Sequence, residues 1–197
     1  MFGNDYLEKL KVYLGKDIEI SDNGDEVKIY VDAEIQYFLR KSEERYILYI
    51  QERGNETKEK EYASELEMKR NFALWMKNTF GESIEYPFSG KFREAKSVSE
   101  LKNLMSQYTE EALYSVNDLN EEKINIEQKE GDLYSIFFMD KNGNKYILEQ
   151  DEEAPFVFKR FYNEVVYYGE TLKQIEEYEE VFEDKLDYNV KIQVLGY

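Results

Sequence analysis

The first 81 residues alternate apolar and polar positions in a pattern that predicts a helix, four strands and a second helix. Apolar residues at helical spacing from 5 to 14, followed by Gly15, indicate the first helix. Alternation with a period of two predicts strands over 17–21, 27–31, 35–40 and 46–52. The sequence Asp-Asn-Gly-Asp at 22–25 supplies a hairpin turn between the first two strands. A longer amphipathic helix is expected over 61–80, ended by Gly81.

Residues 82–96 show no clear period and contain Pro87 and Gly90. Proline and glycine mark turns and connections, so this segment is predicted to join two parts of the chain. The sequence therefore predicts an N-terminal α+β unit over 1–81, a connection over 82–96 and a C-terminal unit over 97–197. The two units are compatible with packing as a single domain.

The second half of the chain begins with a capping box, in which Ser97 is followed three residues later by Glu100, so a helix is expected from there to about Ala112. Period-two and aromatic-rich patterns predict strands over 123–128, 133–139, 146–149, 156–168 and 188–195. The Asn142-Gly143 pair predicts a tight hairpin. A helix capped at Thr171 is expected to run to about 184, with Leu172, Ile175, Tyr178 and Phe182 on its apolar face.

These elements predict an α+β fold in which antiparallel sheets pack against helices. The two halves resemble each other: Ile-Glu-Ile at 18–20 followed by Gly24-Asp25 has a counterpart in Ile-Asn-Ile at 124–126 followed by Gly131-Asp132. Two interpretations stay open. The halves are an internal duplication of an αβββα-type unit, or two Tyr-, Ile- and Asp-rich segments align by chance.

Composition narrows the possible functions. The chain of 197 residues has no histidine and no cysteine, which excludes imidazole- or thiolate-based catalysis, disulfides and ordinary zinc sites. It carries 43 acidic against 26 basic side chains, a net charge of −17, which opposes binding to nucleic acids and anionic membranes. We therefore expect a non-enzymatic protein with no cofactor. A hydrolase that uses only carboxylates stays open as an alternative, since such an enzyme needs only two acids at the correct separation.

The acidic residues include one pattern that could bind calcium. Asp140, Asn142, Asn144 and Asp151 fall at the first, third, fifth and twelfth positions of an EF-hand-like loop. The glycine is misplaced, however, and the twelfth residue is Asp instead of Glu. A hairpin turn explains these residues better, and no metal site is expected.

The excess negative charge is uneven along the chain. Residues 1–96 have 20 acidic and 16 basic side chains (net −4), whereas residues 97–197 have 23 and 10 (net −13). The candidate partner-binding residues are the carboxylates of two dense runs: Glu149, Asp151, Glu152, Glu153, Glu176, Glu177, Glu179, Glu180, Glu183 and Asp184. Tyrosines are favoured at interfaces, and Tyr167, Tyr168 and Tyr178 lie in the same half. The alternatives are a solvated acidic face and half-buried tyrosines.

The second acidic run is costly for a helix. Like charges four residues apart, such as Glu176–Glu180 and Glu179–Glu183, cost about 0.2–0.5 kcal/mol each. The only opposite-charge pair at this spacing is Lys173–Glu177. Glutamates near the end of the helix also interact unfavourably with its dipole. The run is thus expected to serve a basic partner, or otherwise to be a solvated face.

Residues 46–81 resemble a known class of proteins. The similarity rests on a strand Tyr-Ile-Leu-Tyr at 46–49, then Glu-Arg-Gly at 52–54, a polar loop and a helix ending in Phe80-Gly81. With these features the segment is similar to immunity proteins encoded beside bacterial polymorphic toxins. The resemblance implies a cytoplasmic, stoichiometric inhibitor that covers the active site of a toxin. It assigns no binding residues, because the contact surfaces of such proteins differ with each toxin.

The electrostatics are compatible with that partner. Many toxin domains are nucleases with a basic groove, and an acidic inhibitor would be steered to one at about 10⁸ M⁻¹s⁻¹ or faster at low salt. An acidic adaptor, or a nucleic-acid mimic that binds another host or phage protein, is the alternative. Residues 1–14 lack the pattern of a signal peptide and no apolar run could span a membrane, so a cytoplasmic location is expected. The oligomeric state stays open.

Overall fold

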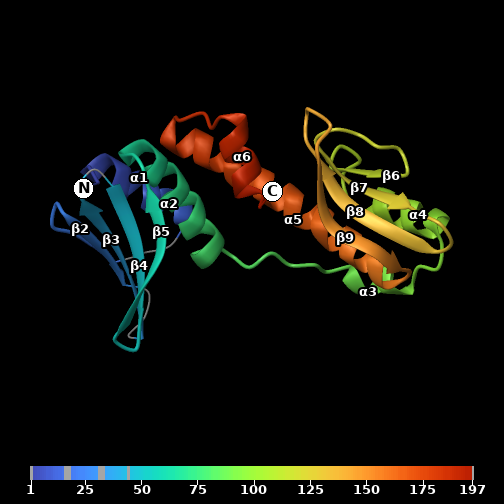
Figure 1. The fold of residues 1–197 in the computed structure, drawn as a ribbon, viewed down its shortest axis with the longest axis horizontal. Coiled ribbons are helices and arrows are strands. Elements are labelled where there is room, and N and C mark those ends of the chain that lie inside the picture. The colour runs from blue at the N-terminus through green and yellow to red at the C-terminus, as the bar shows by residue number, and fades with distance from the viewer. Residues whose placement is uncertain (1, 16–18, 31–33, 44, 197) are drawn as a thin grey trace. The chain divides into compact units, whose positions relative to one another are not determined.

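The computed structural model describes residues 2–15, 19–30, 34–43 and 45–196 (Figure 1). The fold is α+β, with 41% of the described residues helical and 31% in strands. The chain forms two compact units: unit 1 comprises Met1–Glu82 and Gln174–Leu186, and unit 2 comprises Ser83–Lys173 and Asp187–Tyr197.

Unit 1 contains a five-stranded antiparallel sheet in which the strands lie in chain order. The strands are β1 (Glu19–Asp22), β2 (Glu26–Tyr30), β3 (Ile35–Ser42), β4 (Arg45–Glu52) and β5 (Asn55–Tyr62). The turn predicted between the first two strands is confirmed: Asp22 Oδ1 accepts a hydrogen bond of 2.8 Å from the Gly24 N–H. Residues 17, 18 and 31 of the predicted strands lie outside the described part of the chain.

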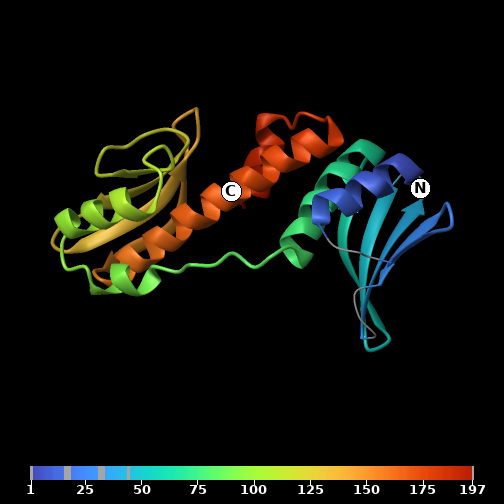
Figure 2. The same cartoon turned by 180° about the vertical axis from the view of Figure 1, so that it is seen from behind.

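Helices α1 (Asn4–Leu14) and α2 (Glu65–Phe80) lie on one face of this sheet (Figures 1 and 2). Alternate strand residues point toward them, and Tyr37 of β3 meets Trp75 of α2 edge-to-face at 5.1 Å. The fully buried core of the unit includes Leu10, Val27, Ile29, Leu39, Leu48, Met68, Phe72 and Met76. One face of the sheet is therefore packed and the other carries polar and aromatic residues, as is common for antiparallel sheets.

Unit 2 contains a four-stranded sheet in the order β6 (Tyr114–Val116), β7 (Lys123–Gln128), β8 (Leu133–Met139) and β9 (Lys145–Glu153). β6 runs parallel to β7 and the other pairs are antiparallel, so this sheet is mixed, whereas the expected α+β fold of sheets packed against helices is confirmed. Parallel neighbours ordinarily need a long crossover. Here six residues suffice, because β6 has only three residues and the return path is short.

A buried asparagine holds this short connection. The side chain of Asn125 accepts a hydrogen bond from the Asn120 N–H at 2.9 Å and donates to the carbonyl oxygens of Asn120 and Lys123. A buried polar side chain needs hydrogen-bond partners, and Asn125 finds all of its partners in or next to the loop over 117–122. No sequence signal had indicated a strand at 114–116.

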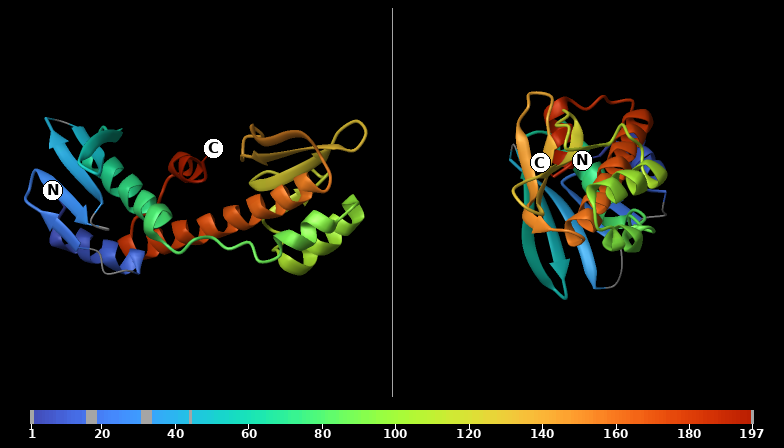
Figure 3. Two further views of the ribbon diagram at one scale, coloured as in Figure 1. Left: turned by 90° about the horizontal axis from the view of Figure 1, so that it is seen from below. Right: turned by 90° about the vertical axis from the view of Figure 1, so that its right-hand side faces the viewer.

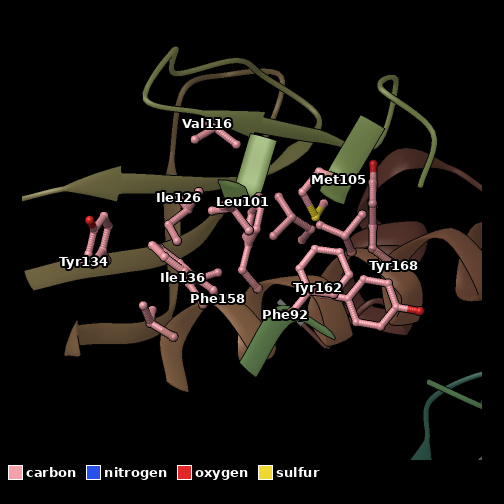
Figure 4. Packing of buried hydrophobic residues seen from close by; sticks show 14 of the residues in the cluster. Phe92, Leu101, Met105, Val116, Ile126, Tyr134, Ile136, Phe158, Tyr162 and Tyr168 are labelled. Atoms are coloured by element: carbon pink, nitrogen blue, oxygen red, sulfur yellow. The ribbon is translucent and has the colours of Figure 1, made fainter. Parts of the chain in front are cut away.

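Four helices complete unit 2: α3 (Ser89–Glu94), α4 (Val98–Tyr108), the first part of α5 (Phe156–Phe182) and α6 (Tyr188–Val194). Their apolar residues and the facing side of the sheet form one core (Figure 4). Members with less than 2% exposure include Phe92, Leu101, Met105, Ile124, Ile136, Phe138, Phe158, Phe161 and Tyr162.

Helix α5 is 27 residues long, and its residues up to Lys173 belong to unit 2 whereas those from Gln174 belong to unit 1 (Figure 3). The prediction of strands over 156–168 was therefore wrong, as was a helix start at Thr171. Aromatic and β-branched residues had favoured strands there, but the buried residues recur at helical spacing: Val157, Phe158, Phe161, Tyr162, Val165 and Tyr168. The Thr171 hydroxyl donates to the Tyr167 carbonyl oxygen inside the helix instead of capping it.

Other boundaries also differ from the predictions. The charged segment before α2 is strand β5, and α2 begins only after the N-cap Ser64, whose hydroxyl accepts from the Glu67 N–H. Residues 188–195, predicted as a strand, contain helix α6, capped by the Asp187 carboxylate. Helix α4 ends at Tyr108, short of Ala112. Elsewhere the capping box at Ser97 and the strand limits 123–128 and 133–139 are confirmed.

The predicted domain limits change as well. The segment 82–96 is more than a connection, because it contains α3 with the fully buried Phe92. The segment Gln174–Leu186 packs with unit 1, so the expected C-terminal unit 97–197 is divided. The two sheets differ in strand number and direction, and the halves of the chain consequently do not repeat one topology. None of the helices formed by the described residues is long and apolar enough to cross a membrane.

Candidate partner-binding surface

The end of α5 packs against unit 1 through its apolar side. The Tyr178 ring stacks on Phe182 with centroids 4.6 Å apart, and Tyr13 of α1 meets both rings edge-to-face at 5.8 Å. The Tyr13 hydroxyl donates to the Gln174 carbonyl oxygen at 3.0 Å. This part of the predicted apolar stripe is confirmed, and it fixes which flank of the helix faces outward.

Several carboxylates of the acidic run pair with cations of α1 and α2. Asp184 receives two hydrogen bonds from the Arg70 guanidinium, at 2.6 and 2.7 Å, and one from the Tyr178 hydroxyl at 3.1 Å. Glu177 lies 2.9 Å from Lys77, and Glu183 lies 3.4 Å from Lys9. The sequence could not show these partners, because each lies far away in the chain. The Lys173–Glu177 spacing suggested a local pair, but Lys173 contacts Glu170 at 2.8 Å.

Glu179 is buried and has a structural role. Its carboxylate accepts from the Leu186 N–H and from the Lys185 ammonium, both at 2.9 Å. These bonds hold the turn that follows α5, where Glu183 has a positive φ of 54°. Its place among the candidate surface residues was wrong, since a carboxylate satisfied in this way cannot face a partner.

Glu176 and Glu180 on α5 are exposed, and so is Glu183 in the following turn, whose side chain stays 83% exposed beside Lys9. Lys185 lies in their field: its hydrogen bond with Glu179, together with the charges of Glu180 and Glu176, raises the pKa of its ammonium group. On α1, the exposed Asp5 lies 3.8 Å from Lys9, which also contacts Glu183. The acidic flank of unit 1 thus consists of Glu176 and Glu180 on α5, Glu183 in the turn that follows α5, and Asp5 on α1.

The first acidic run lies on β9, at the edge of the sheet of unit 2. Asp151, Glu152 and Glu153 are exposed and Glu149 is half-buried. Charged residues on an edge strand prevent pairing with the edges of other sheets. Protection of the sheet edge therefore explains the acidic run on β9, and no binding partner is needed to explain it.

Two of the three candidate tyrosines are core residues. Tyr178 is 2% exposed and Tyr168 is 5% exposed. The Tyr168 hydroxyl donates to the Glu122 carbonyl oxygen at 2.8 Å, and burial raises the pKa of this phenol to about 12. Only Tyr167 is partly accessible, so the prediction of a tyrosine-rich docking surface was wrong for Tyr168 and Tyr178.

An ion pair that the sequence analysis did not single out lies in unit 2. The Glu164 side chain on α5 is 13% exposed and forms an ion pair with Arg160 at 2.8 Å. Burial, and to a smaller degree the nearby charge of Glu149, raise the pKa of Glu164, whereas Arg160 lowers it. The i,i+4 spacing of Arg160 and Glu164 was the available signal. Because Arg160 engages the Glu164 carboxylate, this ion pair supports the helix.

The calcium-like pattern forms a turn. Asp140 Oδ1 accepts from the N–H groups of Asn142 and Asn144, both at 2.8 Å, and Oδ2 accepts from the Asn144 side-chain amide at 2.8 Å. Both carboxylate oxygens are therefore used by the hairpin itself. Within the described part of the chain, no group of three or more His, Cys, Asp or Glu residues could hold a metal ion.

The division of charge also changes in three dimensions. Unit 1 has 24 acidic and 14 basic side chains (net −10), and unit 2 has 19 and 12 (net −7). The apparent asymmetry along the sequence arose because residues 174–186, with six acids and one lysine, come late in the chain yet belong to unit 1.

Comparison with protein families, characterised proteins and solved structures finds no match to this chain. The function must therefore be argued from the surface itself.

The pairing of Asp184 and Arg70 predicts a pH-dependent contribution to the stability of unit 1. The Arg70 hydrogen bonds lower the pKa of Asp184, so its stabilisation is present above the unfolded pKa of about 4 and is lost as the pH falls through the folded value. We expect Asp184→Asn to lower the free energy of unfolding by about 1–3 kcal/mol at pH 7.

Urea unfolding at pH 7 and at about pH 3 tests this expectation, because the difference between wild type and variant should shrink in acid. Asp5→Asn, at a carboxylate 86% exposed, is the control and should change stability little at either pH. A difference for Asp184→Asn that is unchanged in acid would contradict the assigned ion pair.

Proposed function

We propose that this chain is a non-enzymatic immunity protein: a cytoplasmic, stoichiometric inhibitor of a bacterial toxin domain whose active-site groove is basic. The observation that carries the proposal is the set of exposed carboxylates at the end of α5, in a unit with net charge −10: Glu176 and Glu180 on the helix and Glu183 in the turn that follows it. The class of partner comes from the resemblance of residues 46–81 to immunity proteins.

The arrangement of this flank supports a binding role. Glu176 and Glu180 are one helical turn apart on α5, so their mutual repulsion lowers the stability of the helix end. The contacts of Tyr178, Phe182 and Asp184 hold the same helix end in unit 1 and offset that repulsion. Carboxylates spaced along a fixed helix can occupy the positions of nucleic-acid phosphates in a basic groove and speed the encounter.

The test is binding to the toxin-like protein encoded by the neighbouring gene, measured by biolayer interferometry at low and high salt. An equimolar complex that blocks the toxin is expected, and no complex at low salt would overturn the proposal. A partner encoded elsewhere and captured instead would favour the adaptor or nucleic-acid mimic.

The double variant Glu176→Lys/Glu180→Lys should slow association about tenfold or more at low salt, because electrostatic steering acts mainly on the on-rate. Asp151→Lys/Glu152→Lys makes the same change of charge on β9 and is the matched control. An equal effect of both variants would show that net charge alone matters, and no effect of the α5 variant would exclude that flank.

A further inference from the structure

The sheet of unit 1 has a face that no described helix of the unit covers. Helices α1 and α2 lie together on the opposite face (Figures 2 and 3). The strand register places Lys28, Phe38, Tyr49 and Lys58 opposite one another in a row across β2 to β5 on the uncovered face. Arg40 and Ile47 form the next row. We call the outward-pointing residues of β1–β5 the open face.

The centre of the open face is aromatic and already ordered. Phe38 is only 5% exposed although no helix covers it, because the Arg40 guanidinium lies 5.2 Å and the Lys28 ammonium 5.3 Å from its ring centroid. Arg40 also lies 5.0 Å from the Tyr49 ring. Cations over aromatic rings fix both side chains, so little rotamer freedom is left to lose on binding.

The charges of the open face neutralise one another. Arg40 bridges Glu26 at 2.5 Å and Glu56 at 2.6 Å, and Lys28 lies 3.4 Å from Glu26. Arg45 and Lys58 both form ion pairs with Glu61. With Glu19 on β1, the described strands thus present four acids and four bases on this face, a net charge of zero. The unit as a whole has a net charge of −10.

We propose that the open face is the interface of a symmetric dimer of this chain. A two-fold interface brings one patch against an identical copy of itself, so a patch with an excess of one sign repels its partner. A patch with equal numbers of both signs can be self-complementary. Arg40 and Tyr49, which are half-buried at the centre over Phe38, are of the types enriched in interfaces, and the lysines and glutamates lie around them.

Salt distinguishes this association from binding to a basic partner. Two copies of a chain with net charge −17 repel each other outside the contact, and salt screens that repulsion. The dimer is therefore expected to become tighter as salt rises, whereas a complex driven by opposite charges becomes weaker. The inference does not depend on the function proposed above.

The experiment is sedimentation equilibrium of the full chain over a range of concentrations at about 50 mM and about 500 mM NaCl. The average mass should approach twice 23.7 kDa, with a dissociation constant lower at the higher salt. Ile47→Glu and Ile47→Lys place opposite charges at one half-buried position of the open face, and each should weaken the dimer about tenfold or more.

Val12→Glu, at a residue of α1 that is 67% exposed, adds the same charge as Ile47→Glu away from the sheet and should leave the dimer intact. Tyr30→Glu, at the rim of the open face, serves if an Ile47 variant does not fold, as judged by its circular dichroism. A chain that is monomeric at both salt concentrations overturns the proposal. So does loss of the dimer in Val12→Glu, or a stronger dimer in Ile47→Lys.

Discussion

Replacing Tyr178 with alanine should lower the free energy of unfolding of unit 1 by about 3–5 kcal/mol. The side chain is 2% exposed, stacks on Phe182 and meets Tyr13 edge-to-face. Truncation would leave a cavity between α5 and α1 and remove the hydroxyl that donates to Asp184. The measurement is urea or thermal unfolding followed by circular dichroism.

Two companion variants separate the contributions. Tyr178→Phe keeps the ring and should cost only about 1 kcal/mol, the usual net value of one hydrogen bond. Tyr167→Ala, at a half-buried position on the same helix, should cost clearly less than Tyr178→Ala. If Tyr178→Ala instead left stability unchanged and weakened binding to a partner, Tyr178 would be an interface anchor and its assignment to the core would be wrong.

The elements that could be predicted from the sequence are those with a local signal. The hairpins at Gly24 and Gly143 could be predicted because glycine beside Asp and Asn residues favours a turn. In the structure both glycines have positive φ, 97° and 79°, and the neighbouring Asp side chains stabilise the turns. The helix at Ser97 was found from its capping box. In each case the physical cause lies within a few residues of the element.

Elements were missed where composition and spacing disagreed. The first half of α5 is rich in aromatic and β-branched residues, which have a preference for strands, but its apolar residues recur at helical spacing and pack on a sheet. The spacing decided the structure because it determines which residues can be buried together. Strand β5 was missed for the opposite reason: it is an exposed edge of alternating Lys and Glu residues and has almost no apolar face.

The candidate surface could be located only in part. Helical spacing places Glu176 and Glu180 one turn apart on α5, as the sequence predicted. The same reasoning failed for Glu183, because the helix ends at Phe182 and Glu183 lies in the following turn with a positive φ of 54°. The sequence could not show that Glu177, Glu179 and Asp184 are held by Lys77, Lys185 and Arg70, since two of these three cations lie far away in the chain. Only the fold of unit 1 determines which carboxylates are left for a partner.

The structure also implies that Phe92 is as important to unit 2 as Tyr178 is to unit 1. Phe92 is fully buried, and its ring stacks on Tyr162 of α5 with centroids 4.2 Å apart and an angle of 12° between the planes. It lies in the segment 82–96 that resembled a simple connection. We expect Phe92→Ala to lower the free energy of unfolding of unit 2 by about 3–5 kcal/mol, because it removes a large apolar side chain from the centre of the core.

Phe88→Ala is the matched control, since Phe88 precedes the same short helix and is only half-buried against Tyr108. Its effect should be clearly smaller. Hydrogen exchange followed by mass spectrometry places each effect, because Phe92→Ala should increase exchange mainly in β7, β8 and α4, whereas Tyr178→Ala should increase it in α1 and α2. If Phe92→Ala were no more destabilising than Phe88→Ala, residues 82–96 would be a connection after all. Unit 2 would then have to form its core without α3.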